Sequence, residues 1–198
     1  MKYFNTLPKI AYTNPLGVST IYTNIMARAN LIPKSLSNSL SFYEYSIQDE
    51  DTPEIIAHKY YGSVDRFWMV LYANQINDPQ WDWPLSSRKF EKYVKNKYPN
   101  TLNDLHHYEM IVKKDIQGSL VGSTTEKFII SEEDYNSMIP EEINTYVLPE
   151  ETVTVTITKQ EISNYEFENT ENEKKRNIKL LKKDYVNQLE KEFMKLMS

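Results

Sequence analysis

One segment of the chain, residues 42–98, carries a nearly unbroken series of local signals for secondary structure. Apolar and polar residues alternate over 43–47, which is typical of a half-buried strand. Thr52 can cap a helix, and Pro53 occupies a first-turn position where its missing N–H is not needed. Gly62 suits the left-handed residue that follows a helix. The segment therefore predicts a strand, a polar turn and a short, well-delimited helix.

Two further helices follow in the same segment. Ser63 begins one that ends near Asn74, and Ser86 or Ser87 begins another that ends before Pro99. Apolar residues recur along each predicted helix at spacings of three and four, which marks a buried face. We therefore expect a small α+β module with its own core. The expected core residues are Tyr45, Ile56, Tyr60, Gly62, Phe67, Trp68 and Leu71.

The segment before this module, residues 1–41, is less well specified. It mixes Asn, Ser, Thr and Pro with scattered hydrophobic residues. The spacing within 21–26, and again within 36–40, is compatible with short helices. We expect an arm that packs on another surface, which can belong to another chain.

The segment after the module, residues 100–165, predicts mainly β-structure. Its expected strands are 106–112, 125–130 and 152–158, with a helical turn over 131–138. Three strands with long polar connections make a thin sheet. Such a sheet needs support from the rest of the chain or from a partner.

The strongest helical pattern lies in the last segment, residues 166–198. Thr170 and Glu173 form a capping box, and an apolar stripe follows at spacings of three and four. The pattern predicts one long amphipathic helix over 170–197. Its wide stripe must be buried, either on the chain's own body or on a partner, and the residue types leave both alternatives open. The candidate partner contacts in this stripe are Ile178, Leu181, Tyr185, Leu189 and Phe193.

The chain is thus expected to be an α+β protein of four segments. These are an arm over 1–41, the module over 42–99, a β-rich insert over 100–165 and the amphipathic helix over 166–198. At 198 residues the chain is long enough to bury a core of its own.

Several kinds of chemistry lack the residues that they require. The chain contains no Cys, which excludes a disulfide framework, a cysteine zinc site and a thiol nucleophile. His106 and His107 are adjacent, so on a strand they should point to opposite faces, and His58 has no spaced partner. Four glycines leave no phosphate-binding loop. We expect no catalytic, cofactor or metal site.

Charge and hydropathy exclude two further classes of partner. The net charge of −5 and the lack of a basic stripe argue against nucleic-acid binding. The longest apolar run, residues 67–73, is far shorter than the roughly 20 residues of a membrane-spanning helix. We expect neither nucleic acid nor a membrane as a partner.

Aromatic residues point instead to contacts between proteins. The chain has 15 Tyr, 7 Phe and 3 Trp, and tyrosine combines an apolar ring with a polar end. Trp81 and Trp83 flank Asp82 in a loop bounded by prolines. We expect Trp81 and Asp82 to contact a partner and Trp83 to close the module as a plug.

The residues of the module also resemble a known small fold. Tyr43-Glu44-Tyr45-Ser46-Ile47, then Asp51 to Ala57, then the second helix running to Ala73-Asn74 resemble a LysM module. That fold has a strand, two short helices and a second strand.

Neighbouring motifs make the resemblance more specific. They are similar to the LysM-like baseplate wedge protein of T-even-type contractile-tailed bacteriophages, and the resemblance covers most of the chain from residue 40 onward. The motifs are Tyr60-Tyr61-Gly62-Ser63, Phe67 to Leu71, Asn77-Asp78-Pro79, Asp82 to Ser86, His106 to Glu109 and Asn172 to Leu181.

This resemblance implies a structural role in the virion. The family occupies the inner tail baseplate, one copy in each of six wedges, and ties neighbouring wedges together around the hub. The implied partners are the wedge core proteins and the small, sheath-initiating, lysozyme-like baseplate subunit, with assembly in the host cytoplasm. On the partner alternative for the last helix, we expect deletion of 170–198 to leave 42–98 folded and to abolish assembly.

Two other functions stay open at this point. A peptidoglycan-binding LysM module of a tail-associated or cell-wall protein would hold a glycan between loops 48–52 and 75–79. The inserted run 81–84 and the third helix depart from that module, which suggests a surface redirected to protein. A hydrolase with a carboxylate pair is the weaker alternative, because nothing places two carboxylates in a cleft.

Overall fold

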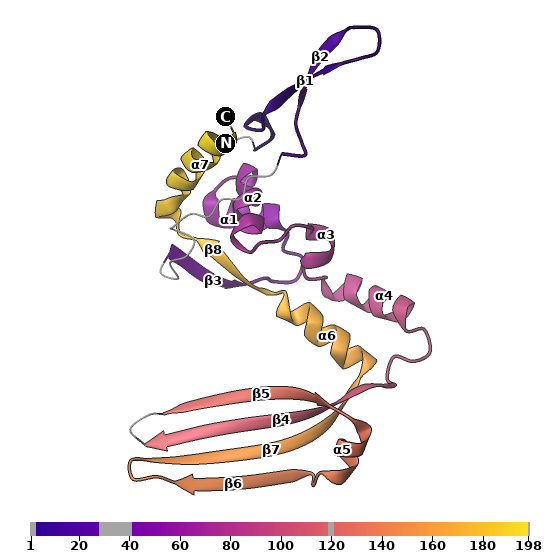
Figure 1. Ribbon diagram of the computed structural model, residues 1–198, viewed down its shortest axis with the longest axis vertical. Coiled ribbons are helices and arrows are strands. Elements are labelled where there is room, and N and C mark those ends of the chain that lie inside the picture. Colours follow the sequence, from indigo (N-terminus) through magenta and orange to yellow (C-terminus); the bar gives the residue numbers. More distant parts are fainter. Residues whose placement is uncertain (1–2, 28–40, 119–120, 198) are drawn as a thin grey trace. The chain divides into compact units, whose positions relative to one another are not determined.

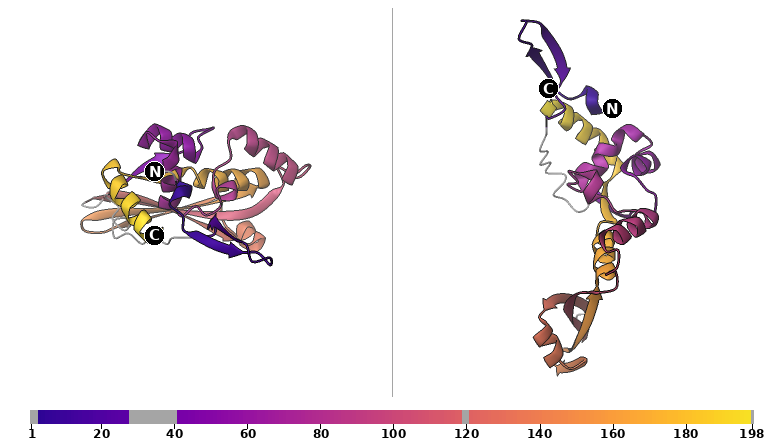
Figure 2. Two further views of the ribbon diagram at one scale, coloured as in Figure 1. Left: turned by 90° about the horizontal axis from the view of Figure 1, so that it is seen from above. Right: turned by 90° about the vertical axis from the view of Figure 1, so that its right-hand side faces the viewer.

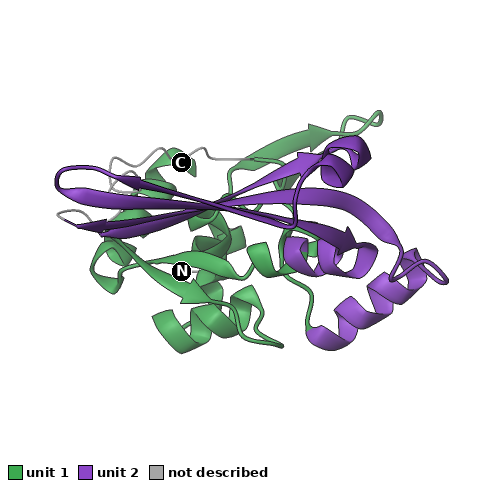
Figure 3. Cartoon of the chain, turned by 90° about the horizontal axis from the view of Figure 1, so that it is seen from below, with its two compact units in different colours: residues 1–86, 172–198 green, residues 87–171 purple. Residues whose placement is uncertain are grey.

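The computed structural model shows a mixed α+β chain, which confirms the expected fold class at that level. The residues that it describes are 3–27, 41–118 and 121–197. The chain divides into two compact units (Figure 3): unit 1 contains residues 1–86 and 172–198, and unit 2 contains residues 87–171. Unit 2 is therefore an insertion within the sequence of unit 1. The expected segment 42–99 spans the boundary between them.

Unit 1 is built on a two-stranded antiparallel sheet whose strands lie far apart in the sequence (Figure 1). β3 (Phe42–Ser46) pairs with β8 (Asn177–Leu181), with Tyr45 opposite Ile178. Helices from both ends of the chain complete the unit. They are α1 (Pro53–Tyr61), η3 (Val64–Arg66), α2 (Phe67–Ala73), α3 (Pro79–Asp82) and α7 (Lys183–Met197).

The local signals of α1 act as expected. The Thr52 hydroxyl accepts a hydrogen bond from the backbone N–H of Ile55, and Pro53 is the first helical residue. Gly62 ends the helix with φ at 71°, a conformation that favours glycine. The second helix differs from the expectation, because a 3-10 turn, η3, precedes α2, and the Ser63 side chain makes no capping bond.

The core of unit 1 combines residues from both of its sequence segments. Of the residues expected there, Ile56 and Trp68 are buried, and Tyr45, Tyr60 and Phe67 pack against the buried cluster. Leu71 is half-buried, and Gly62 is exposed in its capping position. The buried members of the cluster are Leu7, Ile47, Ile56, Ala57, Tyr61, Trp68, Met69, Val70, Ile178, Leu180, Leu181, Val186, Leu189, Phe193 and Met197.

The single helix expected over 170–197 is wrong. The chain forms α6 (Asn164–Lys174), then the strand β8, and then α7. Ile178, Leu180 and Leu181 are buried in β8, where the backbone pairs with β3. A long-range strand pairing thus overrides a helical spacing of apolar residues.

The expected capping box is displaced for the same reason. Thr170 and Glu173 lie inside α6 rather than at the start of a helix. The same spacing occurs seven residues earlier, in Ser163 and Glu166. The Ser163 hydroxyl accepts from the Glu166 N–H at 3.3 Å, and the Glu166 carboxylate accepts from the Ser163 N–H at 2.9 Å.

The N-terminal arm begins with η1 (Tyr3–Asn5) and continues as a hairpin of β1 (Lys9–Thr13) and β2 (Ser19–Thr23). The short helix expected over 21–26 is therefore wrong. Turn chemistry decides the outcome, because the Asn14 side chain accepts from the N–H groups of Leu16 and Val18, and Gly17 adopts a φ of 80°. The helix expected over 36–40 lies outside the described residues.

Unit 2 consists of a four-stranded antiparallel sheet with three helices (Figure 1). The strand order is β5-β4-β7-β6. The three strands expected from the sequence are present and longer than expected, and β6 was not expected. The strands are β4 (Leu105–Gly118), β5 (Gly122–Ile130), β6 (Glu141–Val147) and β7 (Glu151–Ser163). The helices are α4 (Ser87–Lys97), α5 (Glu132–Ser137) and most of α6.

A helix cap and a glycine mark the ends of two strands of the sheet, β5 and β4. Ser131 accepts from the Asp134 N–H at 3.1 Å, so the helical turn expected over 131–138 forms as α5. Gly118 closes β4 with φ at 139°, and a Cβ atom there would lie 2.3 Å from the Glu150 carbonyl oxygen. Glycine is therefore required where the ends of β4 and β7 meet.

The chain leaves unit 1 after residue 86 and returns to it at residue 172, and hydrogen bonds within unit 1 link these two points. The Asn172 side chain accepts from the Leu85 N–H at 2.7 Å and donates to the Leu85 carbonyl at 3.2 Å. Arg176 adds donations to the carbonyl oxygens of Ile47 and Leu85. The buried amide of Asn172 thus holds the outgoing and returning chain side by side.

Candidate functional site

The described part of the chain offers little chemistry for catalysis. Over residues 3–27, 41–118 and 121–197, no group of three or more His, Cys, Asp and Glu side chains could hold a metal ion. Within the same ranges, no helix is long and apolar enough to cross a bilayer.

The placement expected for the two adjacent histidines is wrong. A register irregularity between Leu105 and His107 at the start of β4 breaks the alternation, and the Nδ1 atoms of His106 and His107 lie 2.7 Å apart. His106 stacks on Phe167 with ring centroids 3.9 Å apart, and Nε2 of His107 lies 3.2 Å from Glu109 Oε1. Both imidazoles therefore take part in packing and hydrogen bonding within unit 2.

The apolar stripe near the C-terminus packs on the chain's own body. Ile178, Leu181, Leu189 and Phe193 are all at most 4% exposed and belong to the core of unit 1. Tyr185, at 36% exposure, is the accessible member of the candidate set. Of the two alternatives left open by the sequence, burial on the chain itself is the one observed, so the four buried residues form no contact surface.

The tryptophan loop separates its two indoles. Trp83 donates from Nε1 to the Asp51 carbonyl at 2.9 Å and packs against the core, as a plug would. Trp81 is 65% exposed, and its carbonyl accepts from Lys175 at 2.6 Å. Asp82 is exposed, and its carboxylate accepts a hydrogen bond from the Asp78 N–H at 3.1 Å. This bond links the two ends of α3 and stabilises it. Trp81 and Asp82 are thus presented on a fixed, accessible turn.

Asp51, in the turn that follows β3, carries a buried charge. Its side chain is 3% exposed and accepts from Lys59 at 2.6 Å and from the Tyr45 hydroxyl at 2.8 Å. Burial alone would raise the pKa of Asp51, but these bonds and one from the Gln48 N–H outweigh it and lower that pKa. Burial and the bond to Asp51 raise the pKa of Tyr45 to about 12. The carboxylate thereby fixes the loop between β3 and α1.

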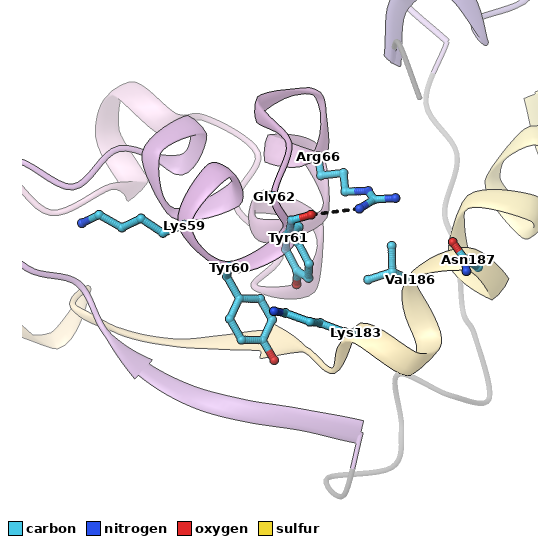
Figure 4. Close-up of a pocket in the computed structure, with 8 residues that line it drawn as sticks. All are labelled: Lys59, Tyr60, Tyr61, Gly62, Arg66, Lys183, Val186 and Asn187. Atoms are coloured by element: carbon cyan, nitrogen blue, oxygen red, sulfur yellow. Dashed lines mark hydrogen bonds between the residues drawn. The ribbon is translucent and has the colours of Figure 1, made fainter.

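A groove lined by lysine and tyrosine lies between α1 and the start of α7 (Figure 4). Two hollows, of about 340 and 380 Å³, share Tyr60 and Lys183 as lining residues. The Lys183 ammonium lies 5.3 Å from the Tyr60 ring centroid, and the Lys182 ammonium lies 5.2 Å from that of Tyr43. The sequence did not predict this groove because its walls come from two segments that lie more than 100 positions apart.

The hairpin of unit 1 is exposed along both strands. Ile10 and Tyr22 face each other across it and are 49% and 52% exposed, and Ile21 on the opposite side is 71% exposed. An isolated hairpin of five-residue strands is marginally stable in water. Apolar side chains on both of its faces favour a further contact surface.

The two faces of the four-stranded sheet differ along its central strand β7. On the edge strands both faces expose apolar residues, Phe128 and Tyr146 on one and Ile129 and Ile143 on the other. Strand register places Val112 of β4, Ile157 of β7 and Tyr146 of β6 on one face, which we call the apolar face. Threonines of β7, including Thr154 and Thr156, lie on the other, which we call the polar face. Further members of the apolar face are Met110, Ile116, Phe128, Val153 and Val155.

Comparison with known proteins identifies the family of the chain. The family model described as Base plate wedge protein 53 matches residues 2–196, which is nearly the whole chain. A comparison with curated proteins finds no match. The chain therefore belongs to the base plate wedge protein 53 family, structural components of the phage virion whose place is the tail baseplate and whose partners are other baseplate proteins.

Proposed function

We propose that this chain joins neighbouring baseplate wedges around the central hub through protein–protein contacts. The observation that carries the proposal is that each compact unit exposes apolar side chains outside its core. In unit 1 these lie on the hairpin and at Trp81, and in unit 2 they lie on the sheet. One chain with two separate contact surfaces can hold two neighbours at once.

The proposed partners follow from the family resemblance. They are the wedge core proteins and the small, sheath-initiating, lysozyme-like baseplate subunit, with one copy of this chain in each of six wedges. Assembly takes place in the host cytoplasm before the particle is complete. No step requires catalysis.

We also infer that unit 1 contains a LysM-like module whose second strand is supplied by β8. The order β3, α1, α2, β8 and the antiparallel pairing of its two strands support this inference. In a glycan-binding module the ligand lies against loops 48–52 and 75–79. Here Asp51 and Trp83 immobilise the first loop, and α3 follows directly after the second. The surface is therefore better suited to protein than to sugar.

Reconstitution from purified wedge proteins tests the joining function. Wild-type chain should convert single wedges into closed six-fold baseplates in electron micrographs. Ile10→Asp combined with Tyr22→Asp on the hairpin should stop this conversion, whereas Thr23→Asp, on the opposite side of the hairpin, should not. Closure without the chain would overturn the proposal, and so would peptidoglycan pull-down of a chain that binds no wedge protein.

A further inference from the structure

The apolar face of the unit 2 sheet is the surface with the most defined chemistry. Its centre lies on β4 and β7, where Val112 pairs with Ile157 and Ile116 pairs with Val153. Val153 is buried and the other three central residues are half-buried, but Phe128 and Tyr146, on the two edge strands, are 43% and 56% exposed. The described chain therefore leaves much of this face open to solvent.

The chain itself shows what packs well against one end of this face (Figure 2). The short helix α5 lies against β4, with Tyr135 stacked on Tyr108 at a centroid distance of 4.4 Å. Lys159, on the same face, donates to the carbonyl oxygens of Tyr135 and Met138 at 2.5 and 2.6 Å. A helix is thus the element that this face already accepts.

Charges at the rim define the partner more closely. One row across the sheet reads Glu126, Val112, Ile157, Glu142, so a carboxylate stands at each edge of this row. The next row reads Thr124, Lys114, Val155, Asn144 and adds one exposed lysine on β4. Residues 87–171 as a whole contain 16 Asp and Glu against nine Lys and Arg, a formal net charge of −7. A partner with flanking cations is complementary to this pattern.

Distances across the sheet fit a helix. Four strands spaced by roughly 4.8 Å put the two edge strands roughly 14 Å apart, and a helix with side chains is roughly 10–12 Å wide. Lysines on either side of its apolar stripe would reach Glu126 and Glu142. A second copy of this chain fits poorly, because its sheet would bring the same carboxylates against one another.

We propose that the apolar face of unit 2 binds an amphipathic helix of a baseplate partner, whose apolar stripe is flanked by Lys or Arg. The inference rests on the proposed function for the identity of the partner as a baseplate protein. The recognition chemistry is tested with the isolated full chain and does not require assembled wedges.

The probes are two synthetic 18-residue helices with the same leucine stripe, one flanked by lysines and one by glutamates. Fluorescence anisotropy should show that the full chain binds the lysine helix at least tenfold more tightly, with an advantage that shrinks as salt rises. Glu126→Lys with Glu142→Lys should reverse the preference. Glu141→Lys is the matched control, because Glu141 neighbours Glu142 on β6 but lies on the polar face.

A second pair of variants tests the apolar contact. Tyr146→Ala should weaken the lysine helix at least fivefold, whereas Val147→Ala, on the opposite face, should leave it unchanged. Circular dichroism melts confirm that each variant is folded. Equal binding of both helices, binding of neither, or equal effects of Glu141→Lys and Glu142→Lys would overturn the proposal.

Sedimentation of the free chain tests the competing occupant. A dimer that Tyr146→Ala dissociates would assign the face to a second copy and also overturn the proposal. Joining of wedges in the reconstitution would then still stand, so the two hypotheses fail separately.

Discussion

The two units of this chain differ in how many hydrophobic side chains they bury. Unit 1 buries a cluster of hydrophobic residues from both of its sequence segments, with Trp68 and Phe193 in contact at a ring distance of 4.6 Å. Among the described residues of unit 2, the buried hydrophobic ones are Phe90, Val94 and Val153. Unit 1 is defined by its packing, whereas unit 2 is defined by its strand ladder and leaves apolar side chains such as Phe128 and Tyr146 exposed.

Among its described residues, unit 2 also buries one charged group, the carboxylate of Glu168. Glu168 accepts from Lys97 at 2.5 Å and from the Tyr98 hydroxyl at 3.0 Å, and so ties α6 to the end of α4. The bond to Glu168 raises the pKa of Lys97. Burial alone would raise the pKa of Glu168, but its bonds to Lys97 and Tyr98 outweigh this and lower it. The comparison predicts that hydrophobic truncations damage unit 1 most.

Removal of residues 172–198 should have the largest effect. The deletion takes away β8 and α7 and with them seven members of the unit 1 core. We expect α1 and α2 to lose hydrogen-exchange protection while β4 and β7 keep theirs. The sequence alone predicted that 42–98 folds without the C-terminal segment, whereas the shared core predicts that it does not. Persistent protection of α1 in the deletion variant would favour the prediction from the sequence.

Trp68→Ala should come next. The indole is 4% exposed and packs against Phe193, so its loss should lower the free energy of unfolding by about 3–5 kcal/mol. Denaturant titration measures the change. Trp81→Ala is the matched control, since that indole is 65% exposed and its loss should cost within about 0.5 kcal/mol.

Asp51→Asn should cost about 1.5–3 kcal/mol at pH 7, because it weakens charged hydrogen bonds to Lys59 and Tyr45. The folded pKa of Asp51 lies below its ordinary value, so its contribution is complete above about pH 4 and is lost as the pH falls through the lowered pKa. The difference between variant and wild type should therefore shrink below about pH 4. A difference that is constant from pH 7 to pH 2 would contradict this assignment.

Phe128→Ala in unit 2 should have the smallest effect on the free chain. The ring lies on an edge strand at 43% exposure, and we expect a loss of about 1 kcal/mol or less in a thermal or denaturant melt. Ile129→Ala, on the opposite face and 74% exposed, serves as the control. A loss as large as that of Trp68→Ala would mean that unit 2 has a closed core and would end the contrast between the units.

The sequence predicted the features that depend on neighbouring residues. Thr52, Gly62 and Ser131 act at helix ends as their types suggest, and the three long strands of unit 2 follow their alternating pattern. The plug role of Trp83 was also predicted, since a large aromatic between prolines suits a packed turn.

The largest failure, the single helix expected over 170–197, comes from pairing over a long sequence separation. Ile178 and Leu181 have a helical spacing, but they form a strand because they pair with β3, more than 130 residues earlier in the sequence. Asp51 is buried because Tyr45, Lys59 and Trp83 converge on it from three elements. No local window contains both β3 and β8, so the C-terminal strand was not expected. The partners Tyr45 and Lys59 are near Asp51 in the sequence, but their convergence depends on the fold of the loop between β3 and α1.

The pairing of β3 with β8 also sets a timetable for synthesis. Unit 1 cannot close its core until the ribosome has made β8, which comes after all of unit 2. At 5–20 residues per second, roughly 5–20 s separate the end of the first segment from β8. During that interval Ile56, Trp68 and Val70 lack the core residues that β8 and α7 supply. Unit 2 is continuous in sequence and can fold in the meantime. The inserted sheet is thus ready for a neighbour before the unit that carries it is complete.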